Sequence, residues 1–142
     1  MFEPYFPESY SDFTDPAKKA AYELALAGVR SRLGASYGLV IDGEWLNTGA
    51  TITSLNPAHP AEVVGVIAAG GVEEAERALR AAWAAFPGWA ARPAAERARI
   101  GVKLAAIMRR NKYELAAIET LEAGKNWLEA EADVAEAIDF VE

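Results

Sequence analysis

Three carboxylates near the end of the chain are spaced so that they could act together. Glu129, Asp133 and Glu136 stand at positions i, i+4 and i+7, which places them along one face of a helix. Like charges at this spacing destabilise an isolated helix by about 0.2–0.5 kcal/mol per pair. Two interpretations remain open. The three are either a solvated acidic face near a helix N-terminus, or a stripe in which one carboxylate binds a cation.

Other groups that could do chemistry are few. The chain has no cysteine, so it supplies no thiolate nucleophile, disulfide or cysteine-based zinc site. Ser54 and the only histidine, His59, show no spacing typical of a catalytic triad, and His59 falls in a predicted surface loop. Gly70-Gly71 precedes a predicted helix, but the chain contains no Gly-x-Gly-x-x-Gly. We therefore interpret this pair as a turn and not as a dinucleotide-binding loop.

The net charge of −7 is unevenly distributed. Residues 92–111 carry six basic side chains and one acid, whereas residues 112–142 carry nine acids and two bases. The basic segment lacks interleaved aromatic residues, and the acidic segment that follows would repel phosphate. We therefore expect a solvated helix face and no nucleic-acid binding. The basic side chains are Arg92, Arg97, Arg99, Lys103, Arg109 and Arg110.

The sequence gives no sign of a membrane segment. No stretch approaches the roughly 20 apolar residues that a spanning helix needs, and the N-terminus lacks the basic and apolar regions of a signal peptide. The length of 142 residues allows one domain of ordinary size. We expect a soluble, cytoplasmic protein.

The first half of the chain predicts an arm, a helix and short strands. Residues 1–14 have no period and predict an irregular arm that needs a surface to lie on. Asp15-Pro16 predicts the start of a helix and Gly34 its end. Asp42-Gly43 interrupts an apolar run and is typical of a type I′ hairpin. Further strands are predicted at 51–55 and 62–67.

The second half predicts a group of helices. The first has an apolar face and stops at Pro87-Gly88; that face is Val72, Ala75, Leu79, Trp83 and Phe86. Pro93 opens the second, whose predicted inner face is Ile100, Leu104, Ile107 and Met108. A third ends near Gly124. The last helix runs from about Trp127 to Val141, and its apolar periodicity is still in phase at Val141. We therefore expect the polypeptide to continue past Glu142.

One segment and the order of the elements resemble a known family. Glu119-Thr-Leu-Glu-Ala-Gly-Lys125 is similar to the Glu-Thr-x-x-x-Gly-Lys signature of aldehyde dehydrogenases, and the Ile41–Trp45 hairpin and Asn56-Pro57 precede it in the same order. The resemblance covers about residues 37–142. It is sharpest for the subfamily that acts on 1-pyrroline-5-carboxylate (glutamate semialdehyde) in proline breakdown. The residues that sharpen it are Ser54–Pro57, Ala82-Trp83, Met108–Arg110, Gly124–Trp127 and Ala132–Phe140.

The resemblance implies a fold and a division into domains. It implies an α/β protein that is α+β in this segment, with a helical arm, a β-hairpin with short strands, and a helical cluster. Residues 1–36 would be the N-terminal arm and helix. Residues 37–142 would be the incomplete N-terminal part of a Rossmann-like cofactor-binding domain that continues beyond the chain.

The resemblance also implies an activity that this chain cannot perform alone. Aldehyde dehydrogenases use a cysteine thiolate that forms a thiohemiacetal, which then loses hydride. That cysteine and the glycine-rich cofactor loop lie beyond residue 142. We therefore expect an inactive N-terminal segment of an NAD-dependent dehydrogenase, with NAD bound by the rest of the enzyme. Its partners would be the remainder of that polypeptide and, at full length, further copies in a homo-oligomer.

Two sites follow by resemblance. Glu136 falls where the subfamily has a glutamate beside the substrate pocket, where a carboxylate could meet the ammonium group of the substrate. The alternative is a structural acid. A monovalent cation could be held by the backbone carbonyls of Ser54 and Leu55 with the carboxylate of Glu122, since hard cations need several oxygens. The alternative for Glu122 is an ordinary acid at a helix end.

A second hypothesis comes from a different functional class. The chain could be a free-standing helical interaction module that derives from an aldehyde dehydrogenase and binds a partner through an apolar face. Either hypothesis predicts exposed apolar patches. The residues expected to form them are Trp83, Phe86, Ile138, Phe140 and Val141.

Overall fold

A computed structural model describes residues 4–142, and these residues form two compact units that are described separately. The helical unit comprises the chain up to Arg32 together with Ala98–Glu142, and the strand unit is Leu33–Arg97. Residues 1–3 of the predicted arm lie outside the described part. None of the helices within residues 4–142 is long and apolar enough to cross a membrane. The predicted boundary at residue 36, between the N-terminal arm with its helix and an incomplete cofactor-binding domain, stays a prediction.

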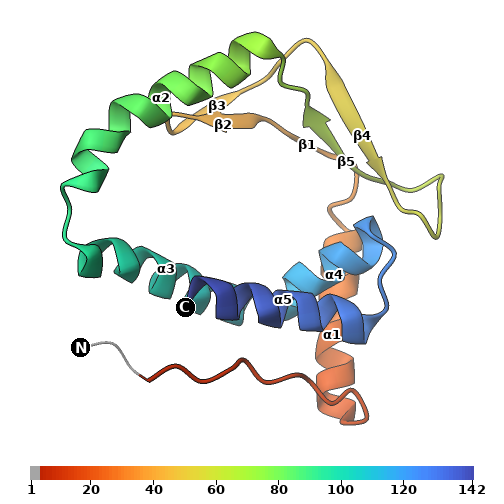
Figure 1. Cartoon of the computed structure of the whole chain (residues 1–142). Coiled ribbons are helices and arrows are strands. Elements are labelled where there is room, and N and C mark those ends of the chain that lie inside the picture. Colours follow the sequence, from red (N-terminus) through yellow and green to blue (C-terminus); the bar gives the residue numbers. More distant parts are fainter. Residues whose placement is uncertain (1–3) are drawn as a thin grey trace. The chain divides into compact units, whose positions relative to one another are not determined.

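The strand unit contains a mixed three-stranded sheet and a separate hairpin (Figure 1). In the sheet, β5 (Val63–Ala68) lies between β1 (Ala35–Tyr37), which is parallel to it, and β4 (Thr51–Leu55), which is antiparallel. The strands predicted at 51–55 and 62–67 are therefore present. β1 was missed, because three residues that pair with a strand about 30 positions later leave no local pattern.

The predicted hairpin is confirmed. β2 (Leu39–Ile41) pairs with β3 (Glu44–Leu46), and Asp42 and Gly43 form the turn between them. Both turn residues have positive φ, 55° for Asp42 and 77° for Gly43. A type I′ turn requires positive φ at both central positions, which is why Asp-Gly favours it.

α2 (Val72–Ala90) is longer than its sequence predicts. The prediction that it stops at Pro87-Gly88 was wrong, because the helix continues through both residues to Ala90. Proline removes one backbone donor, but the end of the helix gains a cap. The Arg97 guanidinium donates to the carbonyl oxygens of Ala90 (3.3 Å) and Arg92 (2.6 Å). The Ala90 carbonyl would otherwise lack a partner at the helix end, and Arg92 lies just beyond that end.

The helical unit is built from four helices: α1 (Pro16–Arg30), α3 (Ala94–Arg110) from Ala98 onward, α4 (Lys112–Glu122) and α5 (Trp127–Val141). α4 lies against both α1 and α5 (Figure 1). The core of the helical unit is rich in small residues, which lets the helices approach closely. The buried cluster is Tyr22, Ala105, Ala116, Ala130, Val134 and Ile138.

The predicted inner face of α3 was wrong for three of its four residues; Met108 does pack against the buried core of the helical unit. Ile100, Leu104 and Ile107 are about half exposed, whereas Ala105 is fully buried. A Cβ on Gly101 would lie 2.6 Å from the Val141 carbonyl oxygen. The face of small residues therefore packs inward because it allows α3 and the end of α5 to come into backbone contact, which the bulkier face would prevent.

Candidate functional site

The three spaced carboxylates all lie on α5, but they are not equivalent. Asn126 caps the helix by accepting a hydrogen bond from the Glu129 backbone N–H (3.0 Å), as asparagine commonly does at this position. The Lys125 ammonium forms an ion pair with Asp133. The stripe thus has a lysine partner that the helix sequence alone did not show. Asp133 is therefore already paired with a cation of the chain, and it shares that lysine with Glu119.

Glu129 and Glu136 are the two exposed acids of this stripe. Among the described residues neither side chain has an ion pair. Val134 and Ile138 are buried on the opposite side, so α5 holds Glu136 on a firmly packed helix. The expectation that Ile138 is exposed was wrong, because it lies in the core, whereas Phe140 on the outer side is exposed as predicted. The pocket role of Glu136 stays a prediction.

The segment that resembles the family signature has a structural task in this chain. Thr120 shares a hydrogen bond with the Tyr22 hydroxyl (2.9 Å), which joins α4 to α1. Lys125 lies 3.6 Å from Glu119 and also pairs with Asp133, which joins α4 to α5. Glu119 Oε2 is buried and has no hydrogen-bond partner among the described residues, so the Lys125 ammonium is the group that compensates its charge.

A buried carboxylate that the sequence reasoning missed is Glu131. Its side chain is 1% exposed, and Oε1 lies 2.5 Å from the Lys112 ammonium. Oε1 also accepts hydrogen bonds from the Ser11 backbone N–H (3.1 Å) and hydroxyl (3.0 Å). The signal was present in the sequence. Glu131, Val134 and Ile138 are spaced i, i+3 and i+7, which places the acid on the apolar face of α5.

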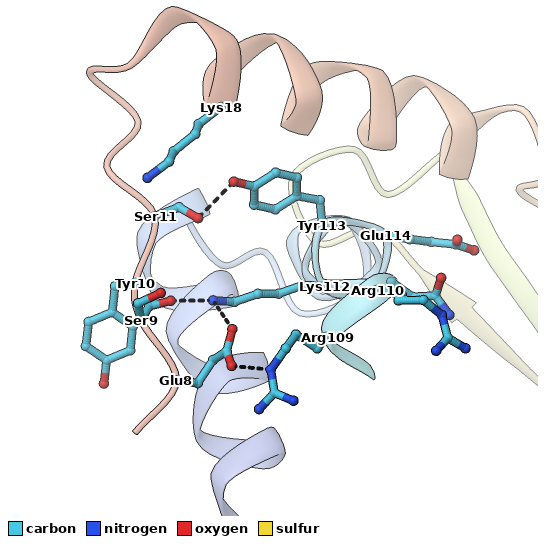
Figure 2. A pocket seen from close by; sticks show the side chains of 11 residues that line it. Glu8, Ser9, Tyr10, Ser11, Lys18, Arg109, Arg110, Lys112, Tyr113 and Glu114 are labelled. Carbon is cyan, nitrogen blue, oxygen red and sulfur yellow. Dashed lines mark hydrogen bonds and ion pairs between the residues drawn. The ribbon is translucent and has the colours of Figure 1, made fainter. Parts of the chain in front are cut away.

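The same network fixes the N-terminal arm on the helical unit. Glu8 accepts from Arg109 (2.6 Å) and lies 3.5 Å from Lys112, which also donates to the Ser9 carbonyl (2.6 Å). Figure 2 shows the arm running past these side chains. A cleft of about 410 Å³ lies between the arm and the α3–α4 corner. The prediction that the arm lies on a surface is confirmed for residues 8–11.

The charged side chains of this cleft compensate one another. Arg109 also donates to Glu142 (2.6 Å), which compensates the acid at the end of α5. The hydrogen bond with Glu8, followed by that with Glu142, raises the pKa of the Arg109 guanidinium above its usual value. Of the six basic side chains in residues 92–111, Arg97 and Arg109 are therefore structural. The predicted site residues do not line this cleft.

The residues predicted to bind a monovalent cation lie in different units. Ser54 and Leu55 are at the end of β4, beside an irregularity in the β4–β5 pairing, and Glu122 is the last residue of α4. The neighbouring Asn56 is buried, and its Oδ1 accepts from the Ala58 N–H (2.9 Å). Asn56-Pro57 therefore forms a local turn. His59 in this turn is exposed, as predicted. The cation site stays a prediction.

Within residues 4–142, no group of three or more histidine, cysteine, aspartate or glutamate side chains could hold a metal ion. The Gly70-Gly71 turn does not fit a dinucleotide phosphate either. The Gly71 N–H at the start of α2 donates to Glu74 Oε2 (2.7 Å), so a carboxylate already occupies the place where a phosphate would bind a helix N-terminus.

The chain is similar to known proteins over its whole length. The family model described as "Aldehyde dehydrogenase family" matches residues 45–142. Over 142 residues the chain is 46% identical to 1-pyrroline-5-carboxylate dehydrogenase of Bacillus pumilus and 48% identical to that of Geobacillus kaustophilus. It spans 28% of the length of each of these curated relatives. The crystal structure of 1-pyrroline-5-carboxylate dehydrogenase from Thermus with bound NAD gives a TM-score of 0.97 at 48% identity, over 99% of this chain and 27% of that one.

Proposed function

The chain belongs to the aldehyde dehydrogenase family, and we propose that it forms the N-terminal part of an enzyme that oxidises L-glutamate γ-semialdehyde to L-glutamate with NAD in proline catabolism. The single observation that carries this proposal is where the similarity lies. The family model begins at residue 45, whereas relatives named 1-pyrroline-5-carboxylate dehydrogenase match all 142 residues. The arm and α1 are thus shared with proteins of that name and not only with the wider family.

In this enzyme Glu136 recognises the amino-acid end of the substrate. It is a carboxylate on a packed helix, and no lysine or arginine among the described residues neutralises it. A charge-assisted contact with the substrate ammonium would compensate the carboxylate and orient the aldehyde end away from it. Asp133 is less suited to this task, since it is already paired with Lys125.

The reactive groups come from the rest of the enzyme. NAD supplies the hydride acceptor when it is bound, and the Gly70-Gly71 turn of this chain does not fit its phosphates because Glu74 caps that helix. The chain has no cysteine to attack an aldehyde. The residues of this chain therefore help to bind and orient the substrate. The chain alone does not oxidise aldehydes. A monovalent cation bound by Ser54, Leu55 and Glu122 would be a structural element of the assembled enzyme.

The test needs a complete enzyme. In the hybrid enzyme, this chain replaces the matched 28% of the Bacillus pumilus relative. We expect the hybrid enzyme to oxidise glutamate semialdehyde with a much higher specificity constant than propanal, which has no ammonium group. A folded hybrid enzyme that prefers propanal would contradict the proposal. A hybrid that does not assemble, while the 142-residue chain binds an unrelated partner, would favour the interaction module.

A further inference from the structure

Lys125 is a single cation that is shared by two carboxylates on different helices. It lies in the turn between α4 and α5, next to Gly124, which has a positive φ of 71°. Its ammonium forms an ion pair with Asp133 on α5 and lies 3.6 Å from Glu119 on α4. The side chains of Lys125, Glu119 and Asp133 are 36%, 34% and 40% exposed. Water and salt therefore screen these charges only in part.

The pairing of Asp133 matters because a second carboxylate stands next to it. Glu136 follows three positions later on the same helix, so the two side chains are neighbours on one face, with Cβ atoms about 5–6 Å apart. Along the helix axis they are separated by about 4.5 Å. Within residues 4–142, Asp133 has an ion pair and Glu136 has none. A cation that approaches this face thus meets one paired and one unpaired acid.

A substrate with one ammonium group can occupy only one of these two positions. Its aldehyde must reach a distance of about 3–3.5 Å from the attacking atom before it can react. An ammonium bound at Asp133 in place of Glu136 would shift the substrate by up to about 4.5 Å along the helix, which exceeds that whole distance. Such a complex would be bound but unreactive.

Glu129, the other exposed acid of the stripe, is a weaker competitor than Asp133. It stands seven positions before Glu136, about 10.5 Å away along the axis. It also lies in the first turn of α5, where the N-terminal end of the helix stabilises its negative charge. Asp133 is therefore the acid whose charge must be compensated if the ammonium is to bind at Glu136.

We infer that Lys125 is a specificity-determining residue: by pairing with Asp133, it leaves Glu136 as the carboxylate that receives the substrate ammonium. The inference rests on the proposed function for the role of Glu136. Lys125 is a positioning residue, since it acts on the substrate through Asp133. Loss of Lys125 frees a second carboxylate one turn from Glu136, and the ammonium then divides between a productive and an unproductive position.

This division has a kinetic signature that a damaged fold does not produce. The specificity constant kcat/KM compares the transition state with free enzyme and free substrate. An additional unproductive complex therefore leaves kcat/KM unchanged, while kcat and KM fall by the same factor. A partly exposed ion pair changes binding by up to about fivefold, so we expect kcat and KM to fall by about two- to fivefold. A damaged fold would lower kcat/KM.

Steady-state kinetics of the hybrid enzyme test the inference. All variants carry Glu119→Gln, because Glu119 Oε2 is buried without a hydrogen-bond partner among the described residues and would lose its cation together with Lys125. In this background, Lys125→Met should lower kcat and KM for glutamate semialdehyde together. Both constants for propanal, which has no ammonium group, should stay unchanged.

A rescue by the neighbouring acid completes the test. Adding Asp133→Asn to Lys125→Met should restore both constants, because it removes the competing carboxylate. Glu129→Gln on the same helix is the matched control and should restore neither. The inference would be overturned if Lys125→Met lowered kcat/KM equally on both substrates, or if Asp133→Asn failed to restore kcat and KM.

The proposed function is scored separately. A folded hybrid enzyme that does not oxidise glutamate semialdehyde would contradict the proposed function, and the inference with it. The other outcome concerns Lys125 alone. If Glu136→Gln lowers the specificity constant for glutamate semialdehyde, but Lys125→Met changes neither kcat nor KM, the proposed function stands and the role of Lys125 is refuted.

Discussion

Removing the Glu131 carboxylate should release the N-terminal arm and destabilise the helical unit. Glu131 is 1% exposed, and it compensates the Lys112 ammonium at 2.5 Å while accepting two hydrogen bonds from Ser11. In Glu131→Ala, Lys112 keeps the Ser9 carbonyl (2.6 Å) and a distant Glu8 (3.5 Å). Breaking a buried ion pair costs about 3–5 kcal/mol. Since two weaker partners remain, we expect a loss of about 3 kcal/mol in the free energy of unfolding.

Urea unfolding measures this loss in the helical unit alone if tryptophan fluorescence reports from Trp127 only. Trp45, Trp83 and Trp89 belong to the strand unit, and replacing them by phenylalanine leaves Trp127 as the single reporter. Glu129→Ala is the matched control, because Glu129 lies two positions earlier on the same helix and is exposed. Its effect should stay within about 0.5 kcal/mol.

A double substitution separates charge from packing. Glu131→Leu with Lys112→Met replaces both charges by apolar groups of similar size, and such replacements of a buried pair are often neutral or stabilising. We expect this variant to unfold within about 1 kcal/mol of the parent. If Glu131→Ala were no more destabilising than Glu129→Ala, or if the double variant were the worst of all, the reasoning from an uncompensated buried charge would be refuted.

Three further predictions follow from the described contacts. In the hybrid enzyme, Glu136→Gln should lower the specificity constant for glutamate semialdehyde about ten- to a hundredfold, the equivalent of about 1.5–3 kcal/mol, with little effect on propanal; equal losses on both substrates would make Glu136 structural. Burial raises the pKa of the Tyr22 phenol, so the folded state retains this proton to higher pH than the unfolded state. Stability should therefore fall as the pH rises above about 10, and Tyr22→Phe should remove that part of the fall in urea titrations. Gly101→Ala should destabilise the helical unit by about 1–3 kcal/mol, because the new Cβ would meet the Val141 carbonyl. Gly28→Ala on α1, with open space around it, should stabilise by up to about 1 kcal/mol; a Gly101→Ala midpoint at or above that of the parent would be inconsistent with the close approach.

Elements specified by local chemistry could be predicted from the sequence, and those specified by distant partners could not. Asp42-Gly43 determines its own turn geometry, and Asp15 accepts from the Ala17 N–H (2.8 Å) to cap α1 as its type favours. β1 depends on β5, and the inner face of α3 depends on how closely Val141 approaches Gly101. Pro87 is a local stop signal, but Arg97 outweighs it by capping the helix three residues later.

The candidate site shows the same limit. The spacing of Glu129, Asp133 and Glu136 placed three acids on one helix correctly, but Lys125 lies outside that helix and pairs with Asp133. Glu131 was overlooked although its spacing placed it on the apolar face, because its compensating partners Lys112 and Ser11 are about 20 and 120 positions away. Charge compensation across such separations is set by the tertiary fold and leaves no local pattern.

Steady-state reduction of NAD in the presence of glutamate semialdehyde is the decisive measurement, made in parallel on the 142-residue chain and on the hybrid enzyme. We predict turnover by the hybrid enzyme and none by the chain, which has no cysteine to attack the aldehyde. Turnover by the chain alone, or a hybrid enzyme that is folded and binds NAD yet leaves glutamate semialdehyde unchanged, would contradict the assignment of this chain to a glutamate-semialdehyde dehydrogenase.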